Sequence, residues 1–291
     1  MLRIRLLGPF QVERDGQALA GNEWRGRQMR TILKILAARA GEVVTGDQLI
    51  DLLWRDEDPA GARRNLHVRI SQLRHALGGD SQAATIQTLE GGYLLELNAE
   101  CRVDRVDFLD AIKQGHQLLA DGQLNQAIER FEAAHALYRG PFLEEDLYEE
   151  WTQAEREYLH QEYLDLLIEL AECHAQRGHF RLAIGLCRQV LEEDNCREAV
   201  YLRLMLYHYY AGEQDQALRT YELCKQTLQR ELEVQPLPDT VILAEQIRNG
   251  QLWAIDNAPR YPPPVLEGRL FSVPFSLGRM PFLGRVNEIS W

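Results

Sequence analysis

The sequence lacks long apolar runs and paired cysteines. No stretch of 18 or more apolar residues occurs among its 291 residues, which argues against a transmembrane helix. The five cysteines contain no C-x-x-C motif and are odd in number, a usage that predicts buried thiols in a reducing cytosol. The opening MLRIRLLGPF carries arginines inside its short apolar run, unlike a signal peptide. We therefore expect a soluble, cytoplasmic protein.

Motifs of catalysis and cofactor binding are also lacking. The sequence contains no G-x-S-x-G elbow, no H-E-x-x-H pair, no Cys/His spacing typical of metal sites and no G-x4-G-K-[ST] phosphate loop. The residues thus predict a protein that is not an enzyme, with no catalytic residue, no metal and no cofactor.

The charge is distributed unevenly along the chain. The net charge is -12, yet residues 1–78 hold 13 basic and 9 acidic side chains, whereas residues 101–291 hold 19 and 31. Electrostatic attraction acts over roughly 8–10 Å at physiological salt, so a locally basic patch can attract phosphate despite an acidic total. The acidic part should discourage non-specific binding elsewhere on the surface.

The most informative segment is PAGARRNLHVRISQLRHAL, which starts at Pro59. Its leucines and isoleucine recur at helical spacing, so they predict one buried stripe, and residues 60–77 hold four arginines and no acidic residue. This pattern predicts an amphipathic helix that presents a basic face to the DNA major groove. The stripe is Leu66, Ile70, Leu73 and Leu77.

The flanking elements are arranged as in a winged helix. We expect strands at residues 3–7 and 9–12, a helix over 27–40 that Gly41 stops, and a second helix opened by Thr45, with Gln48 at capping-box spacing. After the basic helix, Ile86, a Gly91-Gly92 turn and alternating apolar residues predict a hairpin, the wing.

A repeat occupies the helical region, residues 102–250. The pattern G-x4-A-[I/L] starts at Gly122, Gly178 and Gly212, and the last two glycines are 34 residues apart, the tetratricopeptide period. The first interval is longer by 22 residues, and these extra residues accommodate the segment 137–150. We interpret the acidic clusters at residues 144–146 and 192–194 as solvated helix ends. The tyrosines at 201, 207, 209, 210 and 221 are interpreted as repeat core.

These motifs together resemble a known family. LLGPFQVERDG, TGDQLIDLLW, NLHVRISQLRHALGG and GGYLLEL are similar to the winged helix of response regulators, and the whole of residues 1–248 resembles the Streptomyces antibiotic regulatory protein family, which adds a bacterial transcriptional activator domain. The sequence departs from that family at the wing, where Glu90 and Leu94 stand, and at Glu233, where a glycine is usual.

The resemblance and the patterns predict a mainly α protein with a small β part. A winged helix-turn-helix domain at 1–98 precedes a tetratricopeptide-like activator domain at 102–250. Residues 251–291 are expected to be a linker that ends in the possible start of a nucleotide-binding ATPase domain.

The candidate DNA-binding residues lie mostly on the basic helix. Arginines near its start suit phosphate, and outward polar residues suit base edges or are simply solvated. Arg74 either braces the fold or contacts DNA, and Arg27 either contacts the DNA backbone or is exposed surface. The candidates are Arg63, Arg64, Asn65, His67, Val68, Ser71, Arg74, Arg27 and, in the wing, Gly92.

Two functions remain open at this point. The resemblance implies an activator that binds direct repeats in double-stranded promoter DNA as side-by-side protomers and contacts RNA polymerase, in particular its sigma subunit. The alternative is a protein-interaction scaffold, or the regulatory front end of an ATPase, with a degenerate winged helix. The acidic total and Glu90 favour this alternative.

Overall fold

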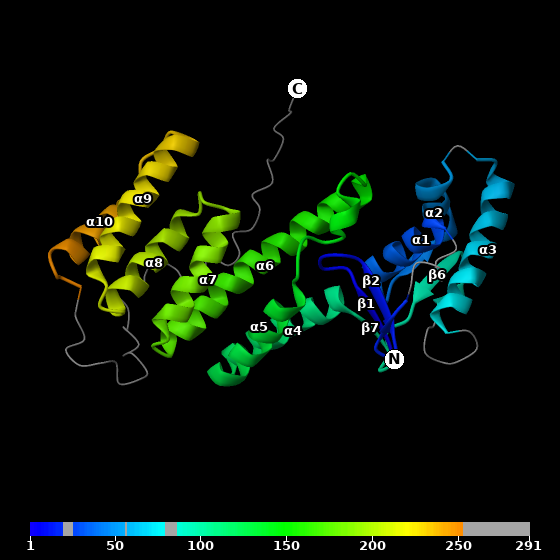
Figure 1. Cartoon of the computed structure of the whole chain (residues 1–291), viewed down its shortest axis with the longest axis horizontal. Helices are drawn as coiled ribbons and strands as arrows, with labels where there is room; N and C mark the ends of the chain where they lie inside the picture. Colours follow the sequence, from blue (N-terminus) through cyan, green and yellow to red (C-terminus); the bar gives the residue numbers. More distant parts are fainter. Residues whose placement is uncertain (20–25, 56, 79–85, 253–291) are drawn as a thin grey trace, which may run out of the picture. The chain divides into compact units, whose positions relative to one another are not determined.

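The computed structural model describes residues 1–19, 26–55, 57–78 and 86–252. Across these residues the chain is mainly helical with two small sheets (Figure 1), as the sequence predicted. The chain folds into two compact units, Met1–Tyr163 and Leu164–Trp291, and their boundary falls inside the long helix α6 (Glu150–Gln176). None of the helices in the described ranges is long and apolar enough to span a membrane.

The first sheet has four strands in the order β3-β2-β1-β7. Leu2 and Ile4 of β1 point into the core, and β1 pairs antiparallel with β2 and parallel with β7. The expected second strand starts later than predicted, because Gly8 has a positive φ of 102° and Pro9 has no N–H to donate. The strands are β1 (Leu2–Arg5), β2 (Gln11–Arg14), β3 (Gln17–Ala18) and β7 (Cys101–Val103).

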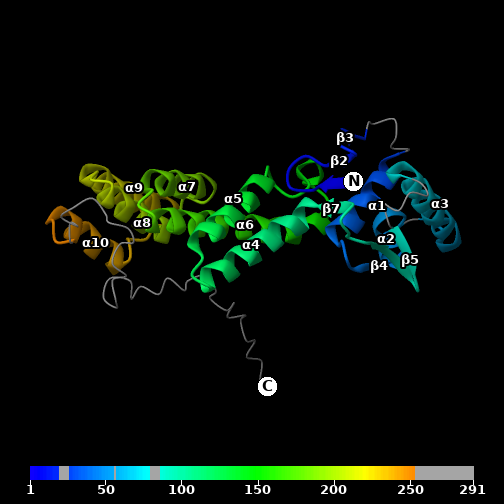
Figure 2. The same cartoon turned by 90° about the horizontal axis from the view of Figure 1, so that it is seen from below.

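Three helices and a second sheet complete the module that we call the reader, the described residues up to 98. The predicted capping box is present: Thr45 Oγ1 accepts from the Gln48 N–H at 3.2 Å, and Gln48 Oε1 accepts from the Thr45 N–H at 3.0 Å. The predicted wing is also present as the β5–β6 hairpin, whose strand β6 pairs with β4; Figure 2 labels β4 and β5 in this region. The elements are α1 (Arg27–Ala38), β4 (Val43–Thr45), α2 (Gly46–Leu53), α3 (Pro59–Leu77), β5 (Ile86–Leu89) and β6 (Gly92–Leu95).

The helical module follows as successive helix pairs. Gly122, Gly178 and Gly212 each lie between the two helices of a pair with φ of 73–79°, the left-handed region in which glycine is unstrained. The alanine five residues after each glycine is fully buried, so the predicted close packing of the second helix is confirmed. The helices are α4 (Asp104–Ala120), α5 (Leu124–Leu137), α6, α7 (Phe180–Glu193), α8 (Glu198–Tyr210), α9 (Gln214–Leu232) and α10 (Pro238–Arg248).

The extra residues between the first two repeats pack against the first sheet. Phe142 and Leu143 are completely buried, and Leu143 has a left-handed φ of 48°. Phe142 forms a β-bridge with Leu7, and the Leu143 N–H donates to the Leu6 carbonyl at 2.8 Å. A short 3-10 helix, η1 (Glu144–Asp146), follows and carries the acidic cluster.

The second unit has its own core, and aromatic and thiol groups lie within it. Tyr201 and Tyr207 are buried, as the core interpretation predicted, and the Tyr209 hydroxyl donates to the Leu252 carbonyl at 2.6 Å. Burial raises the pKa of the Cys187 and Cys224 thiols to about 12. All five cysteines are free, and four of them are buried, in line with the predicted buried thiols. The tail predicted at 251–291 lies outside the described residues from 253 onwards.

Candidate nucleic-acid interface

The apolar stripe of α3 decides which side of this helix faces outward. Leu66, Ile70, Leu73 and Leu77 are all buried, together with Ala62. The stripe packs against α1 and α2, since α3 contacts both helices. Burying such leucines and isoleucines contributes about 1.5–3 kcal/mol each, so the orientation of α3 is strongly determined.

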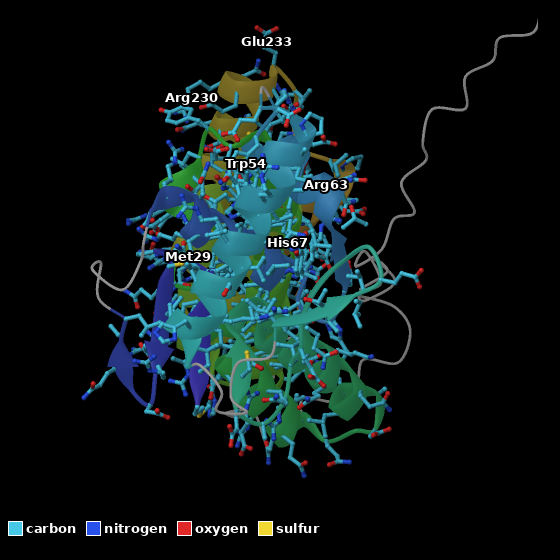
Figure 3. All side chains as sticks on the ribbon, turned by 90° about the vertical axis from the view of Figure 1, so that its right-hand side faces the viewer. Met29, Trp54, Arg63, His67, Arg230 and Glu233 are labelled. Atoms are coloured by element: carbon cyan, nitrogen blue, oxygen red, sulfur yellow. The ribbon has the colours of Figure 1, made fainter. Side chains whose placement is uncertain are left out.

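The opposite side of α3 is exposed and rich in polar and basic groups. Figure 3 looks onto this helix and shows Arg63 and His67 on it. Val68 is 52% exposed, an apolar side chain in the middle of a polar surface. We call this surface the α3 face; its exposed members are Arg63, Arg64, Asn65, His67, Val68, Ser71 and His75.

Acidic residues lie close to the start of the α3 face, which the sequence analysis did not anticipate. Arg63 pairs with Asp47 at 3.4 Å, and the Asn65 amide donates to Glu57 at 3.0 Å. The side chains of Arg63 and Asp47 are 66% and 80% exposed, so this ion pair is worth little and can exchange for another anion. Within the described part of the chain, Arg64 is exposed and forms no ion pair.

The N-terminus of α3 already holds an anion. Asp58 is the N-cap residue and its carboxylate accepts from the Gly61 N–H at 3.0 Å, while Pro59 occupies the first helical turn. A phosphate approaching these amides therefore meets the Asp58 carboxylate. The Asp-Pro step before an amphipathic run is a recognised start signal and would have located this cap in the sequence.

Arg74 braces the wing. Its Nε and a terminal nitrogen donate to the Ile86 carbonyl at 2.9 and 2.7 Å, and the same terminal nitrogen donates to Thr88 Oγ1 at 2.7 Å. Of the two roles predicted for Arg74, this geometry supports the structural one. The contact ties the C-terminal half of α3 to β5.

Gly92 lies at the start of β6, where the backbone of β4 comes very close. A Cβ at this position would lie 2.4 Å from the Val44 carbonyl oxygen, so no larger residue fits without a shift of the strand. Gly92 thereby sets the attachment of the wing to the reader. Glu90 is exposed at the tip of the hairpin, so the tip adds no positive charge there.

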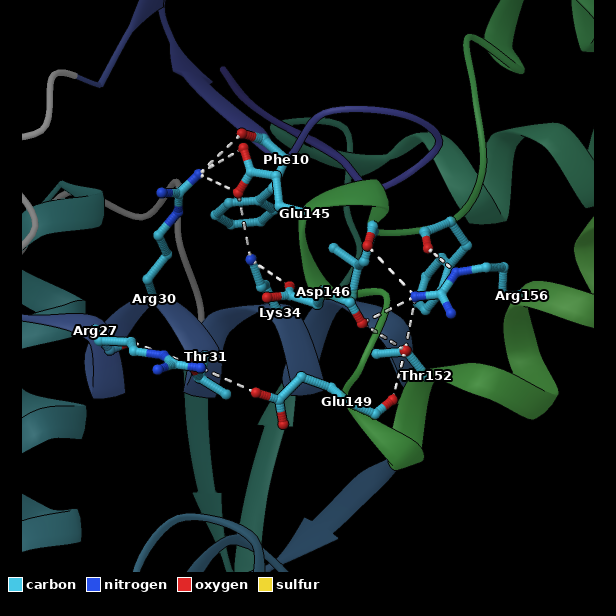
Figure 4. Close-up of polar contacts among 12 residues, drawn as sticks. Phe10, Arg27, Arg30, Thr31, Lys34, Glu145, Asp146, Glu149, Thr152 and Arg156 are labelled. Atoms are coloured by element: carbon cyan, nitrogen blue, oxygen red, sulfur yellow. Dashed lines mark hydrogen bonds and ion pairs between the residues drawn. The ribbon is translucent and has the colours of Figure 1, made fainter.

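The cations of α1 contact carboxylates of the helical module (Figure 4). Arg27 pairs with Glu149 at 3.0 Å, Arg30 pairs with Glu145 at 3.0 Å, and Lys34 lies against Asp146. Interpreting the cluster at 144–146 as a solvated helix end was therefore wrong. Its carboxylates bind cations more than 110 residues earlier in the chain, a pairing that local periodicity cannot reveal.

Metal binding has no support in the described residues. No group of three or more His, Cys, Asp or Glu side chains among them has an arrangement that would hold a metal ion.

Two protein families match successive parts of the chain. Residues 25–95 match the family "Transcriptional regulatory protein, C terminal", and residues 103–248 match the "Bacterial transcriptional activator domain". The first match covers the α3 face and the wing, and the second covers the helical repeats. Fold and site together define a winged-helix transcriptional regulator with a helical activator domain.

Related proteins agree with this class. Transcriptional regulator RedD of Streptomyces coelicolor is 29% identical over 239 residues, which cover 81% of this chain and 67% of RedD. Regulatory protein DnrI of Streptomyces peucetius is 26% identical over 90% of this chain and 97% of its own length. The chain belongs to the Streptomyces antibiotic regulatory protein family of transcriptional activators.

A solved structure extends the similarity to the fold. Mycobacterium tuberculosis EmbR in complex with a low-affinity phosphopeptide superposes with a TM-score of 0.73 at 28% identity. The match covers 86% of this chain and 65% of the EmbR chain, so the chain spans about two thirds of both RedD and EmbR. The winged helix followed by tetratricopeptide-like helices is thus confirmed.

Proposed function

We propose that the chain is a sequence-specific activator that acts in the cytoplasm, binds direct repeats near a promoter and recruits RNA polymerase through its sigma subunit. The observation that carries the DNA-binding part is the α3 face, an exposed surface with no acidic residue between positions 60 and 77 of the chain. A helix of this kind beside a wing enters the major groove in related folds.

The residues of the α3 face have different proposed roles. Arg63 and Arg64 neutralise phosphates, whereas Asn65, His67, Val68 and Ser71 contact base edges. Arg74 and Gly92 act indirectly, since the first braces the wing and the second seats it against β4. Arg27 contacts Glu149, so we assign it to the attachment of the helical module in place of a DNA contact.

The helical module has the second part of the function. Helix pairs of this repeat type expose an extended surface to partners. We propose that this module makes the contact between two protomers on neighbouring repeats and the contact with polymerase.

One observation favours the alternative of an interaction scaffold with a degenerate winged helix. Asp47, Glu57 and Asp58 surround the start of α3 and compete with phosphate for its donors. If these carboxylates outcompete phosphate for the donors, the reader binds DNA only weakly.

Salt-dependent binding separates the two functions. Fluorescence anisotropy of the full chain on DNA from its own upstream promoter, compared with scrambled DNA, should show about 10³-fold tighter binding to the promoter. Arg63→Ala/Arg64→Ala should reduce the log–log salt slope by up to ~2, about 0.9 for each lost phosphate contact.

A charge-matched variant controls for the total charge. Arg181→Ala/Arg188→Ala removes two exposed arginines of α7 and should leave the slope unchanged. Equal, weak binding of both DNAs by the wild-type chain, with no effect of the α3 substitutions, would reject the activator function and favour the scaffold.

A further inference from the structure

Six charges join α1 to the segment before α6, and we call them the α1 latch: Arg27, Arg30, Lys34, Glu145, Asp146 and Glu149. We propose that the α1 latch positions the first helices of the helical module, those of the first unit, on the reader and thereby sets the spacing between two repeats that a pair of protomers can occupy. This proposal rests on the proposed binding to direct repeats.

The acidic half of the latch is held in place before it meets α1. Arg156 of α6 donates to the carbonyls of Phe142 at 2.9 Å and Asp146 at 3.1 Å. The buried Thr152 hydroxyl donates to the Glu149 carbonyl at 2.7 Å. These bonds fix the backbone of the acidic segment, so its carboxylates lose little further freedom when they pair (Figure 4).

The basic half lies along one side of α1. Arg27, Arg30 and Lys34 are three and four residues apart, the spacing of neighbours on a helix surface. The Phe10 ring lies beneath two of these cations, 5.1 Å from the Arg30 guanidinium and 5.0 Å from Lys34 Nζ. The side chain of Lys34 is only 5% exposed, so it depends on Asp146 and on Glu145, 3.6 Å away.

A second attachment holds the helical module to the first sheet. The buried Asp104 carboxylate accepts from the N–H groups of Leu6 and Leu7 at 2.7 and 3.1 Å, and Arg139 donates to it at 3.2 Å. Because this attachment does not involve α1, the module stays on the chain's first sheet when the latch is broken. The latch adds a direct contact of α1 with that module, beside the hydrogen bond that Arg14 of β2 donates to the Ala76 carbonyl of α3 at 2.9 Å.

This geometry links the latch to repeat spacing. DNA completes one turn in about 10–10.5 base pairs, so every base pair added between two repeats turns the second protomer by roughly 35°. A protomer whose first module helices are held rigidly on the reader brings them against its neighbour only when the repeats are in phase. A loosened protomer tolerates more spacings, but its contact with the neighbour is weaker because the module is less preorganised.

The test uses the full chain and duplexes built from its own promoter. Footprinting locates the repeats, and binding is then measured on one repeat and on two repeats with the spacer lengthened by one to six base pairs. The latch variant is Glu145→Gln/Asp146→Asn. Its control is Glu192→Gln/Glu193→Gln, which makes the same charge change on exposed residues of α7.

We expect the latch variant to bind a single repeat within about threefold of the control. On two repeats its cooperativity at the best spacer should fall by about tenfold, and its dependence on spacer length should flatten. A spacer profile identical to that of the control overturns the latch proposal. Failure of the wild-type chain to prefer even a single repeat rejects the DNA-binding function itself, and the latch proposal with it.

A charge swap between Arg27 and Glu149 tests the proposal if Glu145→Gln/Asp146→Asn does not fold. Arg27 is 86% exposed, so Arg27→Glu leaves the core intact while it repels Glu149. Arg27→Glu should flatten the spacer profile, and Arg27→Glu/Glu149→Arg should restore it. A purely structural role predicts no such rescue of the spacing preference, so absence of rescue overturns the proposal.

Discussion

α1 and α3 both carry arginines on a side that faces away from the reader core, yet the two helices have different surroundings. The α1 cations meet carboxylates whose backbone is held by Arg156 and Thr152, and one of these cations, Lys34, is buried. The α3 cations meet exposed acids at longer distance, such as Asp47. The two helices carry the same residue type but differ in their partners. The partners of α1 are held in place by their own hydrogen bonds, whereas the arginines of the α3 face stay exposed.

The comparison also explains part of the net negative charge of the chain. The helical region carries the excess of acidic residues, and part of that excess serves the reader directly through Glu145, Asp146 and Glu149. These carboxylates neutralise the basic side of α1. The arginines of the α3 face take no part in these three ion pairs.

Among the charged residues, removing the buried cation of α1 should have the largest effect. Lys34→Met leaves Asp146 and Glu145 facing an apolar side chain, and losing one partner of a largely buried ion pair costs about 2–4 kcal/mol of unfolding free energy. Urea unfolding followed by circular dichroism measures this loss. The exposed Arg27→Gln is the control and should change stability by less than about 0.5 kcal/mol. Equal effects of the two substitutions would contradict the central place of Lys34 in the latch.

Charge reversal on each helix tests the difference between α1 and α3 directly. Arg64→Glu should weaken binding to a single promoter repeat by about 30-fold at low salt, since it loses a phosphate contact and adds repulsion. Arg27→Glu should change the same affinity by less than about threefold, because its partner is Glu149. Anisotropy titrations give both values. A larger loss for Arg27→Glu would mean that α1, too, faces the DNA.

The carboxylate that attaches the module to the first sheet should respond to pH. Burial raises the pKa of Asp104, although the amides of Leu6 and Leu7 and the Arg139 guanidinium oppose this shift. The stabilisation that arises from this shift is therefore fully present below the ordinary pKa of an aspartate carboxyl. It is lost as the pH rises through the raised pKa of Asp104.

Asp104→Asn removes this titration and should cost about 1 kcal/mol at pH 7 through lost hydrogen bonds. The gap in unfolding free energy between wild type and variant should widen as the pH falls towards the ordinary carboxyl range. Chemical denaturation at pH 7 and near pH 4.5 measures this gap. A gap that narrows at low pH would show that Asp104 is charged and stabilising at neutrality.

The smallest effect is expected at Glu233, one of two residues with left-handed backbones, one in each unit. Glu233 has a φ of 58° at the end of α9 and is exposed, so Glu233→Gly should stabilise the protein by about 0.5–1 kcal/mol. Leu143 has a φ of 48° but is completely buried, so Leu143→Gly should destabilise it despite the same relief. Thermal unfolding of both variants checks the opposite signs. A loss of stability in Glu233→Gly would mean that the glutamate makes a contact worth more than the strain.

The fold was largely predictable because its signals are local. The stripe of α3, the capping box at Thr45 and the glycines between repeat helices each act within a few residues, and all three were found where the sequence placed them. The first sheet was predicted less well, since β1 pairs with β7, nearly 100 residues later, and Gly8 and Pro9 delay the start of β2.

The candidate site was predictable only as a surface. Periodicity showed that Arg64, His67 and Ser71 would face outward, and they are exposed. The competing carboxylates of Asp47 and Glu57 and the brace from Arg74 to Ile86 come from other elements, so no spacing along α3 could indicate them.

The sequence by itself determined the order of the modules, the repeat period and the side of α3 that is buried, because helical spacing and glycine conformation are properties of short segments. Tertiary structure alone decided which cations pair with carboxylates of the helical module. Arg30 and Glu145 are 115 residues apart, and only the packing of the segment before α6 on the first sheet brings them within 3.0 Å. An ion pair depends on distance in space, and that distance is a property of the whole fold.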